Sequence, residues 1–186
     1  MNPEDVYSVS VEGGGTWTDI SRHLPYLRQC AHGNCFEIGV RSGVSTAALL
    51  MGLKDKGNGH LWSIDIADCG HLYDNPLWTF IRAHSVEDAQ RVKEEIPSPL
   101  EVVFIDANHD YDSTLAELRI YGSMVRHQGG VILLHDTDLI GSGVKPAILE
   151  FCKEAKCHAN FHDGSYGLGI LTWDKRALDP EQKEAA

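Results

Sequence analysis

The chain has 186 residues, 42% of them hydrophobic and 23% charged, a composition typical of one globular domain. Its formal net charge of -11 comes from 27 acidic and 16 basic residues, and would repel a phosphate backbone, so we expect no nucleic-acid partner. The apolar runs are much shorter than the roughly 20 residues that cross a bilayer, so we expect no membrane partner.

The start of the chain and the cysteines predict a cytoplasmic protein. Residues 1–6 lack the basic leader and apolar core of a secretory signal. The 5 cysteines are odd in number and include no C-x-x-C pair, which argues against a disulfide framework or a zinc knuckle. Reduced thiols are typical of the cytosol. We expect one domain over residues 1–186, with flexible ends at 1–15 and 175–186.

Short apolar runs alternate with helical patterns, which is typical of a mainly parallel sheet wrapped by helices. The spacing of apolar residues predicts a first helix over 16–29. Strands are expected at 35–40, 60–66, 78–82, 101–106 and 129–136. Later helices are expected at 45–54, 85–95, 112–125 and 144–156. A polar stretch at 67–76 predicts a loop, and an antiparallel pair of strands near Asn160 and 167–173 closes the fold.

The first predicted strand ends in a turn with two glycines, within Glu37-Ile-Gly-Val-Arg-Ser-Gly. Open α/β sheets bind ligands beyond the carboxyl ends of their strands, and glycine lets a ligand approach the backbone without a Cβ clash. We therefore expect Gly39 and Gly43 to lie against a ligand. Ser45 and Thr46 are expected to cap the next helix, whose free N–H groups would face the same ligand.

The charges around this turn favour a cationic nucleoside without phosphates over a dinucleotide. The G-x-G-x-x-G spacing of dinucleotide folds is missing. Glu37 would repel a diphosphate but attract a sulfonium or amino group, directly or through water. The second predicted strand ends in Asp65, where an acid can accept hydrogen bonds from both ribose hydroxyls.

This E-x-G-x-x-x-G turn followed by Asp65 resembles the class I S-adenosylmethionine-dependent methyltransferases. The resemblance extends roughly from Thr16 to Trp173. It implies an α/β fold with a Rossmann-like, seven-stranded, mostly parallel sheet, helices on both faces and an antiparallel C-terminal hairpin. It also implies that Ser85, after the third strand, contacts the adenine. The alternative is that Ser85 is only a helix N-cap, with Asp88 completing a capping box.

Two further acids, Asp106 and Asp136, end the fourth and fifth predicted strands. Neighbouring strand ends lie about 5 Å apart, so both carboxylates are in reach of one divalent cation such as magnesium. Without a partner, two carboxylates at this distance would repel each other.

The pattern Ile-Asp-x-x-His-x-Tyr, followed by Gly-Gly-Val-Ile-x-x-His-Asp-Thr, resembles the catechol O-methyltransferase-like branch and the small-molecule O-methyltransferases that act on sugars and antibiotics. The resemblance implies that Asp106 and Asp136 bind the metal, with Asp106 beside the cofactor. It places the third metal ligand near Thr137, where relatives have an amide or an acid.

The same resemblance places the general base at His109. A histidine with an ordinary pKa near 6.5 is neutral at working pH and can accept a hydroxyl proton. The alternatives for His109 are that it caps the following helix or forms a hydrogen bond across the rim of the sheet. His135 is expected to point to the opposite face of the sheet, in a structural role.

These features together imply transfer of the methyl group of S-adenosylmethionine to a hydroxyl of a small molecule, with Mg²⁺ or another divalent cation assisting. The acceptor class stays open between a sugar, a phenol and a polyketide. A homo-oligomer is compatible with the resemblance. Three alternatives are a metal-free methyltransferase, a hydroxylase or other enzyme on this fold, and a non-catalytic nucleoside-binding module.

Overall fold

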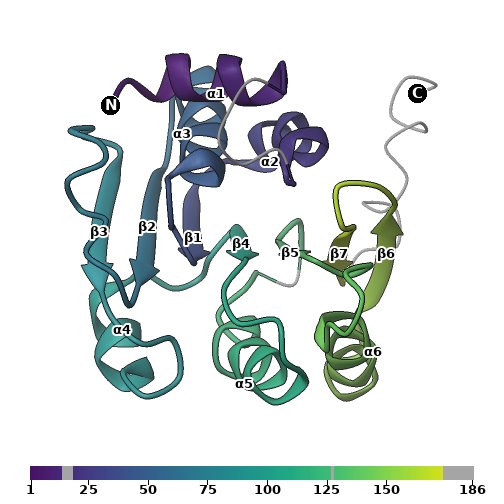
Figure 1. Cartoon of the computed structure of the whole chain (residues 1–186). Coiled ribbons are helices and arrows are strands. Elements are labelled where there is room, and N and C mark those ends of the chain that lie inside the picture. The colour runs from purple at the N-terminus through teal and green to yellow at the C-terminus, as the bar shows by residue number, and fades with distance from the viewer. Residues whose placement is uncertain (14–18, 127, 174–186) are drawn as a thin grey trace.

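The computed structural model describes residues 1–13, 19–126 and 128–173 of the chain (Figure 1). In chain order its elements are α1 (Pro3–Val11), the 3-10 helix η1 (Ser21–His23), α2 (Leu24–Cys30), β1 (Asn34–Ile38), α3 (Val44–Lys56), β2 (His60–Asp65), β3 (Trp78–Arg82), α4 (Ala89–Glu95), β4 (Val102–Ile105), α5 (Tyr111–Gly122), β5 (Val131–His135), α6 (Val144–Ala155), β6 (His158–His162) and β7 (Leu168–Thr172). None of these described helices combines the length and apolar composition needed to cross a bilayer.

The strands form one seven-stranded sheet in the order β3-β2-β1-β4-β5-β7-β6. β1 to β5 are parallel, and β7 is antiparallel to both β5 and β6. In the register, Ile38 lies beside Ile64 and Ile105, and Ile105 lies beside Leu134. Because these strands end level with one another, the residues that follow them meet at one edge of the sheet. The predicted fold class is confirmed.

Helices cover both faces of the sheet (Figure 1). α1, α2 and α3 lie on one face, and α4, α5 and α6 lie on the other. Alternate residues of β1 face opposite sides of the sheet. Phe36 and Ile38 belong to the same apolar cluster as Leu118 of α5, whereas Cys35 belongs to the cluster that contains Leu49 of α3. The sheet therefore separates two apolar cores.

The first fifteen residues, expected to be flexible, contain helix α1. Asn2 caps it by accepting a hydrogen bond from the backbone N–H of Glu4 (3.1 Å), and Pro3 begins it. Val6 and Tyr7 pack against the core on the α3 side of the sheet. The helix carries only a weak apolar stripe, so its stability depends on this contact, which the local pattern does not reveal.

Two predicted helices begin later than expected. The helix predicted over 16–29 is the 3-10 turn η1 followed by α2, and the start of that range lies outside the described residues. α4 begins at Ala89 because the Asp88 carboxylate accepts a hydrogen bond from the backbone N–H of His84 (2.8 Å), while Ser85 turns its hydroxyl elsewhere. The capping box expected from Ser85 and Asp88 is therefore wrong. The predicted loop at 67–76 and the C-terminal hairpin are confirmed.

Candidate active site

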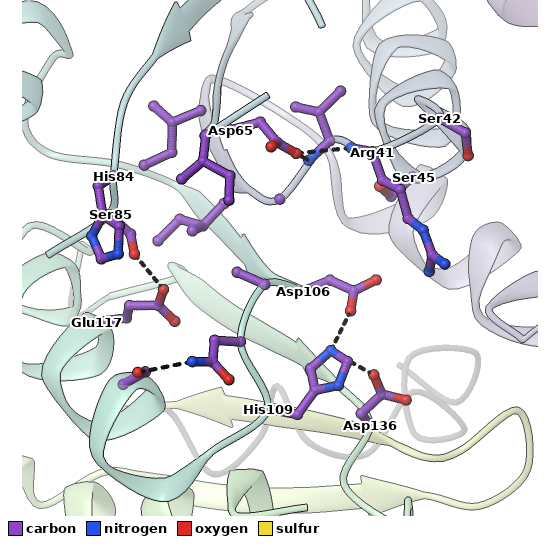
Figure 2. A pocket seen from close by; sticks show the side chains of 18 of the residues that line it. Arg41, Ser42, Ser45, Asp65, His84, Ser85, Asp106, His109, Glu117 and Asp136 are labelled. Atoms are coloured by element: carbon purple, nitrogen blue, oxygen red, sulfur yellow. Dashed lines mark hydrogen bonds and ion pairs between the residues drawn. The ribbon is translucent and has the colours of Figure 1, made fainter. Parts of the chain in front are cut away.

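The carboxyl ends of the parallel strands surround a pocket of ≈ 550 Å³ (Figure 2), a size that suits a small-molecule ligand. Most residues predicted for the site line this pocket: Gly39, Ser45, Asp65, Ser85, Asp106, His109 and Asp136. Three predicted residues, although they belong to the described part of the chain, do not line it: Glu37, Gly43 and Thr137.

Asp65, at the end of β2, holds the turn between β1 and α3 (Figure 2). Its Oδ2 accepts hydrogen bonds from the backbone N–H groups of Val40 (2.8 Å) and Arg41 (2.9 Å), and its Oδ1 accepts one from Ala67 (2.8 Å). The N–H groups of this turn are thus paired with a carboxylate and do not form a cradle for a pyrophosphate. An ionised carboxylate has roughly four acceptor positions, so Asp65 can still accept a hydrogen bond from a ligand hydroxyl in the pocket.

Glu37 lies behind the turn and does not face the pocket. It is 0% exposed, and its carboxylate accepts hydrogen bonds from the hydroxyls of Ser45 (2.6 Å), Thr46 (2.7 Å) and Ser63 (2.7 Å). Burial raises the pKa of Glu37 to about 7, against the opposing effect of the three hydroxyls. This corrects the expectation that Glu37 faces the ligand and that Ser45 and Thr46 cap α3.

The two glycines of the turn are required by contacts within the protein. Gly39 has φ 93°, and a Cβ there would lie 2.0 Å from the carbonyl oxygen of Asp106. Gly43 has φ 78°, and a Cβ there would lie 2.7 Å from the ring of Tyr73, whose hydroxyl donates to the Gly43 carbonyl (2.7 Å). Residues other than glycine rarely adopt a positive φ of this size. Gly43 does not line the pocket, so the expectation that it lies against a ligand is corrected: it makes room for Tyr73. Gly39 lines the pocket as expected, and its missing side chain also makes room for the Asp106 backbone.

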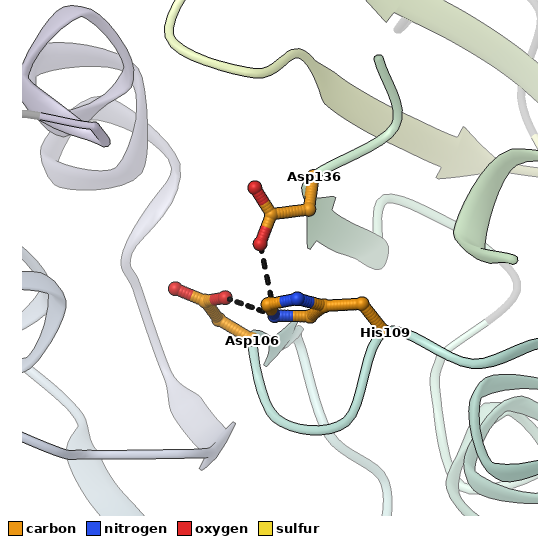
Figure 3. Close-up of side chains that lie close together, drawn as sticks. All are labelled: Asp106, His109 and Asp136. Carbon is orange, nitrogen blue, oxygen red and sulfur yellow. Dashed lines mark ion pairs between the residues drawn. The ribbon is translucent and has the colours of Figure 1, made fainter. Parts of the chain in front are cut away.

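Asp106, His109 and Asp136 form a cluster at one end of the pocket (Figure 3). His109 Nε2 lies 2.8 Å from Asp136 Oδ2 and 3.4 Å from Asp106 Oδ1. One potential ligand atom of each residue lies within 4.8 Å of the others. Two carboxylates suit a hard cation such as Mg²⁺, and an imidazole suits a transition metal, so the donor set fits a divalent cation.

The carboxylates control the protonation of His109. Hydrogen bonds from His109 to Asp106 and Asp136 raise the pKa of His109 to about 9. Burial acts to raise the pKa of Asp106 and of Asp136, but the bonds to His109 and His135 outweigh it and hold both carboxyl pKa values below the ordinary range. This arrangement favours the protonated form of His109 at neutral pH, whereas the role of general base expected for it requires the neutral form.

His135 lies beneath the two acids. Its Nε2 is 2.7 Å from the carbonyl oxygen of Ser165 and donates to it, while its Nδ1 lies 3.3 Å from Asp136 and 3.6 Å from Asp106. The alternation of side chains along β5 ends at Asp136, because Asp136 has a φ of 63°. This bend in the backbone brings the side chains of His135 and Asp136 toward Asp106. The expectation that His135 points to the opposite face is therefore wrong, although it supports the acids rather than lining the pocket.

Thr137 faces away from the cluster. Its hydroxyl points at Gly167, where a Cβ would lie 2.3 Å from Thr137 Oγ1, and it has no hydrogen-bond partner among the described residues. Thr137 therefore does not join Asp106, His109 and Asp136 at the pocket, and a metal ligand at this position stays a prediction. The positive φ of Asp136 turns the chain and sends the next side chain toward β7.

Ser85 lies at the other end of the pocket, next to a residue that the sequence analysis missed. Its hydroxyl donates to Glu117 Oε1 (2.6 Å), and its carbonyl accepts from the hydroxyl of Tyr121 (2.7 Å). Glu117 lines the pocket and is 1% exposed. Thr114, three residues before Glu117, and Tyr121, four residues after it, lie on the same buried face of α5. An acid at this spacing on an apolar face is unusual, and this signal could have identified Glu117 from the sequence.

The open sheet, with its pocket beyond the parallel strand ends, is typical of α/β proteins that bind a nucleoside there. The chain belongs to methyltransferase family 24: the family model, described as a methyltransferase domain, matches residues 36–137, more than half of the chain. The matched segment runs from β1 to just after β5 and includes Asp65, Asp106, His109 and Asp136. It confirms the class I S-adenosylmethionine-dependent methyltransferase family inferred from the sequence. No curated protein sequence matches the chain.

Solved structures share the fold at low sequence identity. MycE, a methyltransferase of the mycinamycin biosynthetic pathway solved with Mg, SAH and mycinamycin VI, aligns with a TM-score of 0.68 and 16% identity, over 92% of this chain and 54% of MycE. An O-methyltransferase from Bacillus cereus with SAH aligns with a TM-score of 0.62 and 18% identity, over 91% and 89% of the two chains. The Podospora anserina methyltransferase PaMTH1, solved with SAH, aligns with a TM-score of 0.64 and 13% identity, over 94% of this chain and 88% of PaMTH1. The chain thus spans about half the length of MycE.

Proposed function

We propose that this protein transfers the methyl group of S-adenosylmethionine to a hydroxyl group of a small molecule, and that Asp106 and Asp136 bind a divalent cation for this reaction. The observation that carries the proposal is the cluster of Asp106, His109 and Asp136 at one end of a nucleoside-sized pocket. Structures with the same fold contain SAH, and the MycE structure also contains Mg and mycinamycin VI, which supports this choice of ligands.

The far side of the pocket would hold the nucleoside. Asp65 would accept hydrogen bonds from the ribose hydroxyls while it fixes the turn after β1. Ser85 and Glu117 would lie beside the base. This placement directs the sulfonium toward the cluster of acids, which Figure 2 shows on the opposite side of the pocket from Ser85. Holding both reactants in this geometry is the main source of rate acceleration in such a transfer.

The cluster would handle the acceptor hydroxyl. A divalent cation bound by the carboxylates would replace the positive charge of His109 and lower the pKa of the hydroxyl. Asp106 and Asp136 orient the acceptor, and His109, once neutral, accepts the hydroxyl proton. His135 fixes the two carboxylates from below through its own bond to the Ser165 carbonyl.

The substitution Asp136→Ala tests the metal assignment. We expect the variant to lose Mn²⁺ binding, measured by electron paramagnetic resonance with SAH present, and to lose Mg²⁺-dependent methylation of a panel of sugars, phenols and polyketides. Its affinity for SAH, measured by calorimetry, should stay within about threefold, because Asp136 lies away from the nucleoside end.

The matched control is Asp138→Ala, which removes an exposed aspartate that pairs with Lys145 and does not line the pocket. It should bind Mn²⁺ and SAH as the wild type does. Parallel loss of SAH and Mn²⁺ binding in Asp136→Ala would show that Asp136 serves the cofactor or the fold, and would contradict the assignment.

A metal-free methyltransferase is the second candidate, and one contact favours it. His109, when protonated, lies between the two carboxylates and offsets part of their negative charge without a cation. In that case His109 and the two acids would only orient the acceptor. Methylation that persists in a strong chelator, together with no Mn²⁺ binding by the wild type, would select this candidate.

A further inference from the structure

Glu117 presents an unsatisfied carboxyl oxygen to the pocket. Its Oε1 accepts the hydrogen bond from Ser85, but its Oε2 is buried and has no hydrogen-bond partner among the described residues. A buried acceptor without a partner destabilises the folded state. Burial also raises the pKa of Glu117 to about 7, against the bond from Ser85. A side chain this costly, on the wall of a pocket, is best explained by a ligand that donates to it.

The surroundings hold this carboxyl in place. Tyr121, one turn further along α5, donates its hydroxyl to the Ser85 carbonyl (2.7 Å), so α5 and the end of β3 are joined twice. Glu117 therefore cannot turn away without breaking the bond to Ser85. Figure 2 shows Ser85 and Glu117 together, across the pocket from His109 and Asp136, with Asp65 on the upper wall of the pocket. A nucleoside whose ribose lies at Asp65 and whose reactive end lies at Asp106 would place its base here.

We propose that Glu117 selects the base, its Oε2 accepting a hydrogen bond from the exocyclic amino group of a 6-aminopurine. The inference rests on the proposed function, since it assumes that the nucleoside is the cofactor of a methyltransferase. It adds the residue that distinguishes adenine from a purine without the amino group. Ser85 acts as a positioning residue that orients the carboxyl and has no free proton left for the base.

Calorimetry with two ligands tests the proposal at pH 8, where the carboxyl is ionised. The ligands are SAH and its analogue without the 6-amino group. The wild type should bind the analogue about tenfold or more weakly than SAH, because a hydrogen bond to a charged group is worth about 1.5 to 3 kcal/mol. Equal affinities would overturn the proposal while leaving the proposed function intact, whereas no binding of either ligand would overturn both.

Variants of Glu117, measured with the same two ligands, test whether this residue causes the discrimination. Glu117→Leu removes both oxygens at similar size, so it should bind SAH about tenfold more weakly and bind the two ligands equally. Glu117→Gln keeps an acceptor oxygen and should restore part of the preference for SAH. Glu94→Gln, on the exposed side of α4, is the matched control and should discriminate as the wild type does. A Glu117→Leu variant that keeps the full discrimination would overturn the proposal, and if that variant does not fold, the two-ligand comparison on the wild type still decides.

Discussion

Glu37 illustrates what a single buried carboxyl does in this molecule. Three hydroxyls, from Ser45, Thr46 and Ser63, satisfy it, and Trp78 donates its indole N–H to Ser63 in turn (2.9 Å). These bonds tie the end of β1 to the first turn of α3 and to β2. The acid that the sequence suggests as a cofactor contact is therefore a structural support for the turn that lines the pocket.

The pH dependence of stability should report this carboxyl. Its pKa rises from an ordinary 4.5 to about 7 on folding, so the folded state binds more protons than the unfolded state between these values. The contribution of Glu37 to the free energy of unfolding is therefore fully present below about pH 4.5 and is lost as the pH rises through about 7. Glu37→Gln cannot titrate. We expect the free energy of unfolding of the wild type, measured by urea denaturation from pH 4.5 to 8, to fall relative to that of the variant as the pH rises. A difference independent of pH would contradict this prediction.

At the scale of elements, the turn from β1 to α3 is held from two sides. Asp65 binds its N–H groups from β2, and Tyr73, from the loop at 67–76, packs on Gly43. That loop takes the place of a crossover helix, and its buried tyrosine contributes to the floor beneath the turn rather than to an open surface. The loop predicted at 67–76 thus also has a role in the core.

Gly39→Ala tests how tightly this turn is built. The alanine must adopt φ 93° and place its Cβ against the Asp106 carbonyl, so both strain and overpacking apply. We expect the free energy of unfolding to fall by about 2 to 6 kcal/mol. The control Gly57→Ala, at the C-terminus of α3, has φ 66° with no atom within 4 Å of the new Cβ, and should cost only about 1 kcal/mol. Urea denaturation measures both, and equal losses would show that the contact with β4 does not matter.

At the scale of the whole molecule, the level ends of five parallel strands bring together residues that lie far apart in the sequence. Asp65 ends β2, Asp106 directly follows β4 and Asp136 directly follows β5, and all three line the pocket. Because Asp65 already occupies the N–H groups of Val40 and Arg41, the pocket is suited to a nucleoside without a pyrophosphate.

Ligand-induced stabilisation tests this selectivity. SAH at 100 times its Kd should raise the free energy of unfolding by about 2.7 kcal/mol, since it binds the folded state alone. NAD at the same concentration should give no rise, because its diphosphate would meet the Asp65 carboxylate, which already accepts hydrogen bonds from the backbone N–H groups of Val40 and Arg41. Thermal and urea denaturation with each ligand provide the measurement. A rise with NAD and none with SAH would contradict the assignment of the pocket and the proposed function together.

The sequence by itself determined the alternation of strands and helices, the family, and the acids that follow the strands, because apolar periodicity and the ends of buried strands are local signals. Only the tertiary structure decided how those residues pair. Glu37 turned inward because three hydroxyls from different segments meet it, Asp136 adopted a left-handed φ that redirected Thr137, and Glu117 reached the pocket from a helix whose contacts are not local. Pairing of this kind depends on distances between segments remote in the chain, which no local pattern encodes.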